Sequence, residues 1–306
     1  MNVAVLGAGT EGRDVASLCA RAGHAVTLHA DDATEAMDRI DTIERGLVDA
    51  AASGEITLET KEQAVEDLQA TTDLEAAVDG SDIVVVTAVT DVETLQERFA
   101  EIESAVERET LIATSATGQS VTTVAAGLRH PDRAIGIHFF DLSNPAVVEL
   151  VLADQTSHEA VERAETVLES LGVHPVRVRD VPGIASTRLE RIFELEAMRA
   201  VDDGVVSVEG IDSLARQEMN LPVGPLERAD RAGLDHRLEL FEEFTQALGT
   251  QFDPPSILRR LVADGKTGID AGEGFYNWEG GEPVESTIDD GDILPREDRP
   301  DDPTQP

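Results

Sequence analysis

The segment Val3-Ala4-Val5-Leu6-Gly7-Ala8-Gly9-Thr10-Glu11-Gly12 decides the fold of this chain. A short apolar run leads into three glycines spaced Gly-x-Gly-x-x-Gly, and a helical pattern follows up to Ala22. The first glycine makes a tight turn, the second lets the backbone approach a ligand, and the third allows close packing of helix on strand. The free N–H groups of the helix N-terminus favour phosphate. The segment therefore predicts a strand-turn-helix unit that binds the pyrophosphate of a dinucleotide. The expected contacts are Gly7, Gly9, Thr10, Glu11 and Gly12.

Apolar runs alternate with helical patterns through the first half of the chain, which is typical of βαβ units. Strands are expected at residues 1–6, 25–29, 82–88, 111–114, 134–140, 147–152 and 175–178. Helices are expected at residues 12–22, 34–52 and 60–68. The run 82–88 is continuous and β-branched, as in a parallel strand that is covered on both faces.

The pattern changes near residue 181, becomes helical up to about residue 263, and turns polar and acidic after Trp278. We therefore predict an α/β chain in which an N-terminal Rossmann-type domain with a parallel-rich sheet precedes an all-α domain. The predicted boundaries are 1–181 for the first domain, 182–280 for the second and 281–306 for an acidic disordered tail. A docked arm is the alternative for these last residues.

The charge of the chain is strongly negative, with 62 Asp and Glu against 24 Lys and Arg and a formal net charge of −38. A nucleic-acid partner is not expected, because a duplex is itself a dense polyanion. A disordered acidic chain conflicts with the apolar periodicity. Adaptation to molar salt explains the charge better, since a Debye length of about 3 Å at 1 M screens self-repulsion. We therefore predict a halophilic, archaeal source and loss of structure at low salt.

Cysteine usage and hydropathy point to the cytoplasm. Cys19 stands alone, so no intramolecular disulfide is expected. No apolar run approaches the roughly 20 residues of a membrane span. The N-terminus leads straight into a strand, which leaves no room for a signal peptide. We expect a cytoplasmic protein with a small-molecule substrate, no membrane partner and no metal site.

The acidic residue that should bind the cofactor ribose is shifted along the chain. Ala30 stands at the expected position about 20 residues beyond the glycines, and Asp31 and Asp32 follow it. Asp31 would repel the extra phosphate of NADP, and no arginine ends this strand, so NAD is the predicted cofactor. A salt-adapted acidic loop is the alternative role of the two aspartates. Ala88, at the end of the run 82–88, is also expected beside the cofactor.

A histidine and a glutamate lie on consecutive expected strands. His138 ends the apolar run Ile135-Gly136-Ile137-His138-Phe139-Phe140, and Glu149 lies on the strand that follows. If the two strands pair, Glu149 would orient the imidazole and stabilise its protonated form, as suits a base that accepts an alcohol proton. A histidine on a strand is also commonly structural, so the pattern alone leaves both roles open.

Four stretches together resemble the 3-hydroxyacyl-CoA dehydrogenase family over about residues 1–278. They are Val3-Ala4-Val5-Leu6-Gly7-Ala8-Gly9-Thr10, Gly136-Ile137-His138-Phe139-Phe140, Pro222-Val223-Gly224-Pro225-Leu226-Glu227-Arg228-Ala229-Asp230 and Gly272-Glu273-Gly274-Phe275-Tyr276. The resemblance implies a Rossmann domain, a helical domain that dimerises, and a substrate cleft between them. It implies that His138 takes the 3-hydroxyl proton while hydride passes to NAD, and that Glu149 assists. Glu149 matches after a one-residue deletion, because Asp141-Leu142-Ser143 precedes Asn144-Pro145 where the family usually has Asn-Pro directly.

Three threonines mark departures from the family pattern. Thr117 falls on the active-site serine, Thr187 replaces an asparagine before an Arg-Leu pair, and Thr90 stands near a glutamate that normally follows the fourth strand. The resemblance implies Thr117 and Thr187 as further active-site residues and Thr90 as a cofactor contact. The basic residues that usually meet the CoA phosphates are thinned to Arg39 and Arg45.

Three functions are compatible with these residues. The first is NAD-dependent oxidation of (S)-3-hydroxyacyl-CoA to 3-oxoacyl-CoA by a His/Glu dyad. The second is a dehydrogenase of a smaller 3-hydroxy acid or sugar acid, and the third is a nucleotide-binding member whose chemistry has decayed. A homodimer is expected, because the segments Ile192–Val201 and Leu234–Leu248 carry apolar stripes and the family pairs through this domain. The same stripes would also suit an internal core.

Overall fold

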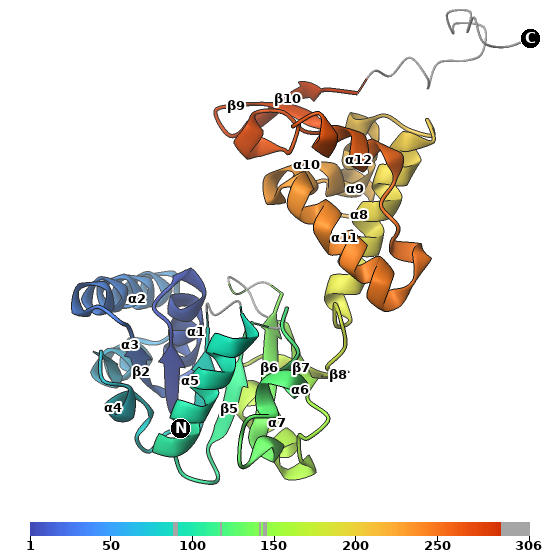
Figure 1. Cartoon of the computed structure of the whole chain (residues 1–306). Helices are drawn as coiled ribbons and strands as arrows, with labels where there is room; N and C mark the ends of the chain where they lie inside the picture. Colours follow the sequence, from blue (N-terminus) through green and yellow to red (C-terminus); the bar gives the residue numbers. More distant parts are fainter. Residues whose placement is uncertain (88–90, 117, 141, 143–145, 289–306) are drawn as a thin grey trace, which may run out of the picture. The chain divides into compact units, whose positions relative to one another are not determined.

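The computed structural model describes residues 1–87, 91–116, 118–140, 142 and 146–288. The chain divides into two compact units, Met1–Ile184 and Ala185–Pro306. Figure 1 draws the first unit in blue to green and the helices of the second in yellow to orange. None of the described helices is long and apolar enough to cross a membrane.

The first unit is built on one eight-stranded sheet in the order β3-β2-β1-β4-β5-β6-β7-β8. Its strands are β1 (Asn2–Leu6), β2 (Ala25–His29), β3 (Leu68–Thr71), β4 (Ile83–Val86), β5 (Leu111–Thr114), β6 (Ala134–Phe139), β7 (Val147–Leu152) and β8 (His174–Arg179). The first six strands in this order, from β3 through β1 to β6, run parallel to one another. Strand β7 pairs antiparallel with β6, and β8 runs parallel to β7. The predicted α/β class with a parallel-rich sheet is confirmed.

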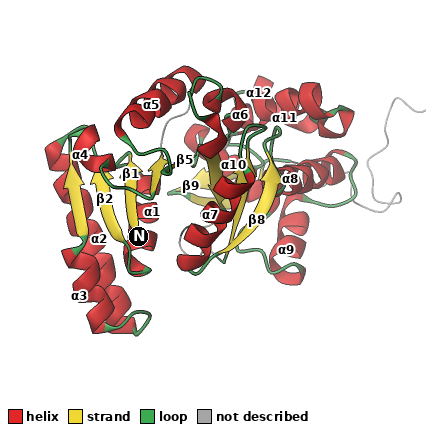
Figure 2. Ribbon diagram, turned by 90° about the horizontal axis from the view of Figure 1, so that it is seen from below, coloured by secondary structure: helices red, strands yellow, loops and turns green. Residues whose placement is uncertain are grey.

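Helices cover both faces of this sheet, which Figure 2 shows in yellow between red helices. They are α1 (Thr10–Arg21), α2 (Ala33–Ser53), α3 (Leu58–Glu66), α4 (Leu74–Val78), α5 (Val92–Ala105), α6 (Val121–Ala125) and α7 (His158–Ser170). Successive residues of a strand point to opposite faces. Accordingly Val3 and Val5 of β1 enter the core that contains α1, α2 and α7, whereas Ala4 and Leu6 enter the core that contains α4, α5 and α6. Burial on both faces explains why the strand runs are continuously apolar.

The strand order reverses direction at β1. Strand β1 has β2 on one side and β4 on the other, so the chain crosses over between them. In open α/β sheets a ligand binds outside the carboxyl ends of the strands at such a switch point. Gly7 follows β1 and Thr87 follows β4, which places both residues at this edge.

The second unit is mostly helical. Its elements are α8 (Ser186–Asp202), α9 (Val208–Glu218), α10 (Pro225–Ala232), α11 (Leu234–Leu248), α12 (Ser256–Ala263) and the hairpin of β9 (Tyr276–Glu279) and β10 (Glu282–Ser286). Its core includes Leu195, Met198, Phe241 and Phe275. The apolar stripes of α8 and α11 therefore serve the core of this unit.

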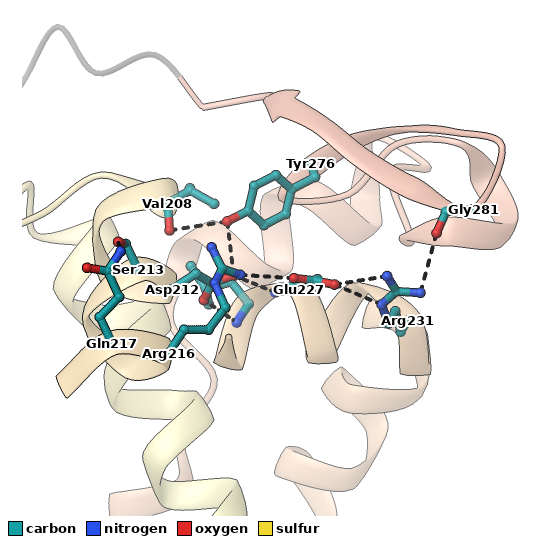
Figure 3. A network of polar contacts seen from close by, with 10 residues as sticks. Val208, Asp212, Ser213, Arg216, Gln217, Glu227, Arg231, Tyr276 and Gly281 are labelled. Atoms are coloured by element: carbon teal, nitrogen blue, oxygen red, sulfur yellow. Dashed lines mark hydrogen bonds and ion pairs between the residues drawn. The ribbon is translucent and has the colours of Figure 1, made fainter. Parts of the chain in front are cut away.

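Two buried aspartates fasten the hairpin to the helices. Asp212 of α9 accepts hydrogen bonds from the backbone N–H groups of Leu226 and Glu227, both at 2.9 Å. Figure 3 shows the hydroxyl of Tyr276 directed at Asp212 and at the carbonyl of Val208. Asp230 of α10 accepts from the N–H groups of Phe275 and Tyr276 at 2.9 Å and from the indole Nε1–H of Trp278 at 3.0 Å. Burial raises the pKa of Asp230 to about 6.

Two expectations are corrected. Residues 68–71 form β3, although the helical pattern was expected to run through residue 68; this short strand lies at the sheet edge and lacks a strong apolar alternation. The predicted tail starts too early, because residues 282–286 form β10 and pair with β9. Thr287 continues this attachment: its N–H donates to the Phe275 carbonyl at 2.9 Å, and Ile288 packs on the core of the unit. Residues 289–306 lie outside the described part of the chain.

Candidate active site

The glycine turn after β1 is packed so tightly that neither Gly7 nor Gly12 has room for a side chain. Gly7 has φ +112°, and a Cβ there would lie 2.7 Å from Thr87 Oγ1 and 2.8 Å from Thr87 O. A Cβ on Gly12 would lie 1.8 Å from the carbonyl oxygen of Gly7. Both positions therefore require glycine, the first for its backbone conformation and the second for the contact between α1 and the turn.

The N-terminus of α1 is left open toward a ligand. Gly9 is the N-cap residue and offers no side-chain cap, so the first N–H groups of the helix lack the partner that a Ser or Asp would supply. Such N–H groups bind phosphate oxygens. Glu11 lies in the first turn, where its carboxylate would compete with a phosphate, so its backbone N–H is the group suited to bind. Thr10 is exposed at the same end.

Thr87 supports the turn from β4, and the sequence pattern did not reveal it. Its N–H donates to the Leu6 carbonyl at 2.8 Å, and its Oγ1 lies 3.2 Å from the carbonyl oxygens of both Leu6 and Gly7. The residue is buried. Thr87 thus ties the carboxyl ends of β1 and β4 together at the switch point. Ala88 and Thr90, the predicted cofactor contacts that follow it, lie outside the described residues.

Arg39 of α2 also supports the turn. It projects from α2, and its Nε–H donates to the carbonyl of Ala8 at 2.6 Å. Its Nη2 also lies 3.6 Å from Oε1 of Glu35, one turn earlier on the helix. Arg45, the other remaining basic residue of α2, donates to the Asp41 carbonyl and to Thr42. Arg39 is therefore engaged by the glycine turn.

A pocket of about 240 Å³ opens beside the turn. Its lining residues are Leu6, Gly7, Ala8, Gly9, His29, Ala30, Asp31, Glu35, Val86, Thr87 and Arg98. The pocket separates the roles of the two adjacent aspartates. Asp32 caps α2, accepting from the N–H groups of Thr34 at 2.8 Å and Glu35 at 3.0 Å, whereas the exposed Asp31 lines the pocket. A pocket at the switch point, an open helix N-terminus and a carboxylate at the end of β2 fit a dinucleotide.

His138 and Glu149 are direct register partners in the antiparallel pair of β6 and β7. Directly opposed residues point to the same face of a sheet, with Cβ atoms about 4.5–5.5 Å apart. Glu149 is 7% exposed and His138 is half-buried. The predicted facing of the two strands is confirmed, and their side chains are neighbours. Because β6 runs parallel to β1, the carboxyl end that carries His138 lies at the same edge of the sheet as the glycine turn.

The end of β5 adds a hydroxyl to this edge. Ser115 follows the strand, its N–H donates to the Val86 carbonyl at 3.0 Å, and it is 7% exposed. Its buried Oγ has no hydrogen-bond partner among the described residues. A buried hydroxyl without a partner is costly, so it is suited to a ligand or a water molecule. Thr117, the predicted active-site residue two positions later, lies outside the described residues.

Thr187 belongs to the second unit. It lies half-buried in the first turn of α8, next to Arg188. The N-cap of α8, Ala185, supplies no side-chain hydrogen bond to this turn. The structure thus brings together the glycine turn, Asp31, His138 and Glu149 on one sheet, and it places Thr187 at the start of the second unit.

Comparison with known proteins agrees with this arrangement. The family model of the 3-hydroxyacyl-CoA dehydrogenase NAD binding domain matches residues 2–181, and that of the 3-hydroxyacyl-CoA dehydrogenase C-terminal domain matches residues 183–278. The chain is 33% identical to the probable 3-hydroxybutyryl-CoA dehydrogenase of Deinococcus radiodurans, over 91% of this chain and 100% of that protein. It is 34% identical to the 3-hydroxyadipyl-CoA dehydrogenase of Escherichia coli, over 90% of this chain and 58% of that longer protein.

A solved structure shows the same architecture. The (S)-3-hydroxybutyryl-CoA dehydrogenase from Ralstonia eutropha superposes with a TM-score of 0.83 at 28% identity, covering 91% of this chain and 99% of that one. The matches confirm NAD as the cofactor and an oxidoreductase as the class of protein. They also confirm the resemblance that the four sequence stretches indicated: the chain belongs to the 3-hydroxyacyl-CoA dehydrogenase family.

Proposed function

We propose that this protein oxidises (S)-3-hydroxyacyl-CoA to 3-oxoacyl-CoA with His138 as the base and Glu149 as its partner. The observation that carries the proposal is the register pairing of these two residues at the sheet edge that also holds the glycine turn. A base must lie within reach of the hydroxyl proton, and the hydroxyl carbon must lie beside the nicotinamide. The pairing of His138 with Glu149 at the edge that holds the glycine turn supports both requirements.

The chemistry divides between the cofactor and the side chains. When bound, NAD supplies the hydride acceptor. His138 accepts the proton of the 3-hydroxyl oxygen as a hydride leaves the carbon that bears this hydroxyl, so the alcohol becomes a ketone. The imidazole becomes positively charged in this step, and the buried Glu149 beside it stabilises that charge and holds the ring in place. Thr117, Thr187 and the hydroxyl of Ser115, which has no hydrogen-bond partner among the described residues, are the groups proposed to hydrogen-bond the substrate.

The cofactor contacts proposed are those of the predicted turn and its surroundings. Gly7, Gly9, Thr10, Glu11 and Gly12 present backbone groups to the pyrophosphate, and Asp31 binds the ribose hydroxyls. Ala88 and Thr90 are proposed beside the nicotinamide half, since they follow the Thr87 that closes the turn. Support comes from the uncapped N-terminus of α1 and from the pocket that Asp31 lines.

A smaller hydroxy acid is a second candidate substrate, and one observation favours it. CoA carries several phosphate charges, yet Arg39, a basic residue kept in α2, is engaged by the Ala8 carbonyl and by Glu35. With a net charge of −38, the protein offers few free cations to a polyanion. An acid that lacks the CoA moiety would need fewer.

The test is a comparison of two substrates in the presence of molar KCl. NADH oxidation is followed with acetoacetyl-CoA and with free acetoacetate, for the wild type and for His138→Gln. Turnover of the thioester that His138→Gln lowers by about 10²–10⁴-fold, with NADH affinity unchanged, supports the proposal. Turnover of acetoacetate alone supports the second candidate, and NADH binding without turnover of either substrate indicates decayed chemistry.

The setting of the enzyme is part of the proposal. We infer a halophilic, archaeal source without nucleic-acid partners from the excess of acidic residues, and a cytoplasmic location without membrane partners from the lone cysteine and the hydropathy of the sequence. A homodimer is proposed as well. Its support is the set of exposed apolar side chains among the described residues of the second unit, namely Leu189, Val205, Leu214, Met219 and Val284. Sedimentation in molar KCl checks the dimer, and circular dichroism after dialysis into dilute buffer checks the requirement for salt.

A further inference from the structure

We propose that Arg98 is a latent receptor for the 2′-phosphate of NADP, and that the carboxylates of Asp31 and Glu35 repel this phosphate and thereby set the preference for NAD. The three side chains line one pocket, although they come from different parts of the first unit. Arg98 lies in α5, Asp31 follows β2, and Glu35 lies in the first turn of α2. The inference rests on NAD as the cofactor and does not depend on the acyl substrate.

Arg98 is available to a ligand. Its side chain is 30% exposed, and its ion pair is with Glu101 on the same helix, at 3.4 Å. Glu101 is itself 56% exposed, so this contact is a weak surface pair. The positive charge of Arg98 acts on another residue that lines the pocket, His29 at the end of β2. Burial and the nearby guanidinium both lower the pKa of His29. A guanidinium also binds phosphate oxygens in a fork geometry that no other side chain offers.

The two carboxylates differ in how strongly they oppose a phosphate. Asp31 is exposed, lines the pocket, and accepts no hydrogen bond from the described residues, so no donor among them offsets its carboxylate. Glu35 lies 3.6 Å from Arg39, which offsets part of its charge. Asp31 is therefore the main source of repulsion, and Glu35 is the smaller one. Asp32 does not take part, because it caps α2.

The arrangement makes a prediction that ordinary repulsion does not. If carboxylates alone set the preference, removing their charge would help NADP whether or not Arg98 is present. If Arg98 is a receptor, the gain depends on it. Neutralising Asp31 and Glu35 and then removing Arg98 separates the two explanations.

The experiment measures binding of free NADH and NADPH by fluorescence titration at fixed salt. The variants are Asp31→Asn, Asp31→Asn/Glu35→Gln, and the latter with Arg98→Gln. Asp38→Asn is the matched control, since this exposed residue of α2 does not line the pocket. We expect the double variant to bind NADPH about tenfold more tightly than the wild type. We expect Arg98→Gln to remove most of that gain and to change NADH affinity less than about threefold.

Two results would overturn the proposal: an unchanged NADPH affinity in the double variant, or a gain that persists after Arg98→Gln. Titration with 2′,5′-ADP gives a second readout, because it carries the 2′-phosphate without the nicotinamide, and its affinity should follow that of NADPH. All the substituted residues are exposed or half-buried, and circular dichroism verifies the fold of each variant. Failure of the proposed acyl-CoA oxidation would leave these binding results unaffected.

Discussion

Two segments of this protein are rich in glycine but have different roles: the turn after β1 and the segment before β9. The turn after β1 packs Gly7 against Thr87 and Gly12 against Gly7, and it leaves a pocket and an open helix end beside it. The segment before β9 packs two of its glycines on Asp230: a Cβ on Gly274 would lie 2.3 Å from Asp230 Oδ1, and one on Gly268 would lie 2.1 Å from Asp230 O.

The difference lies in what occupies the space that the glycines create. In the first unit the backbone N–H groups of α1 remain available to a ligand. In the second unit the N–H groups of Phe275 and Tyr276 are satisfied by the protein's own carboxylate, Asp230. A glycine motif is therefore a binding site only where the chain itself does not supply the anion. Both segments belong to the family pattern, but only the first one is expected to contact the cofactor.

Asp230→Ala should have the largest effect on stability. The substitution leaves two backbone N–H groups and the Trp278 indole without an acceptor in a buried place, so we expect the second unit to lose about 3–5 kcal/mol. Urea unfolding in high salt measures this loss. Trp278 is the only tryptophan, so its fluorescence reports on the second unit. A loss below about 1 kcal/mol would show that the carboxylate does not hold the hairpin.

The contribution of Asp230 to the free energy of unfolding of the second unit should decrease as the pH rises, because the pKa of Asp230 is raised in the folded state. Burial raises the pKa of Asp230 from 3.8 to about 6, so the folded state binds the proton more tightly than the unfolded state. This contribution is fully present below pH 3.8 and is lost as the pH rises through about 6. It amounts to a few kcal/mol.

The matching measurement is Trp278 unfolding at pH 4.5 and pH 7 for the wild type and for Asp230→Asn. The free energy of unfolding of the wild type minus that of Asp230→Asn should increase as the pH is lowered from 7 to 4.5, because only the wild type has the Asp230 carboxyl that takes up a proton. A difference that is constant across this range would contradict the raised pKa. The glycine turn of the first unit has no such carboxylate and should not contribute to the difference.

Gly12→Ala should weaken NADH binding by about a hundredfold or more, since the new Cβ displaces the turn by its contact with Gly7 O. Gly46→Ala in α2 is the matched control, because a Cβ there meets nothing within 4 Å. The control should bind NADH normally and gain roughly 0.5–1 kcal/mol of stability. Equal loss of binding in both variants would remove the distinction between the turn and an ordinary glycine.

Arg39→Met should have the smallest effect. It removes the hydrogen bond to the Ala8 carbonyl without touching the ligand-facing N–H groups, so we expect NADH affinity to fall about three- to tenfold with kcat unchanged. Arg39→Lys should restore part of the affinity. A large drop in kcat with unchanged affinity would instead place Arg39 at the reaction.

The parts of the fold that the sequence predicted are those with strong apolar runs. The bounds of β2, β5 and β7 agree with the expected segments, because these strands are buried and continuous. Strand β3 escaped prediction, since its four residues lie at an edge where only Leu68 is buried. Strand β10 escaped it because hydrogen bonds to a hairpin partner, rather than apolar alternation, hold its acidic sequence.

The site divides in the same way. The sequence predicted the facing of His138 and Glu149 and the glycine turn, because local pattern and strand order determine both. It did not reveal Thr87 or Arg98, and it related Arg39 to the CoA phosphates rather than to the turn. Each of these residues reaches the turn or the pocket from an element distant in sequence. Such contacts depend on the packing of helices over the sheet, which periodicity along the chain does not report.

The antiparallel pairing of β6 and β7 has a consequence for how this enzyme can change. Five successive register pairs, from Ile135 with Leu152 to Phe139 with Val148, fix the position of His138 opposite Glu149. Because these pairs lie within the two strands, we expect a change of length in the connecting segment to leave His138 opposite Glu149. Chemistry and loop length are thus separately adjustable. Loops grafted between the two strands are therefore expected to leave the proposed proton-transfer pair in register.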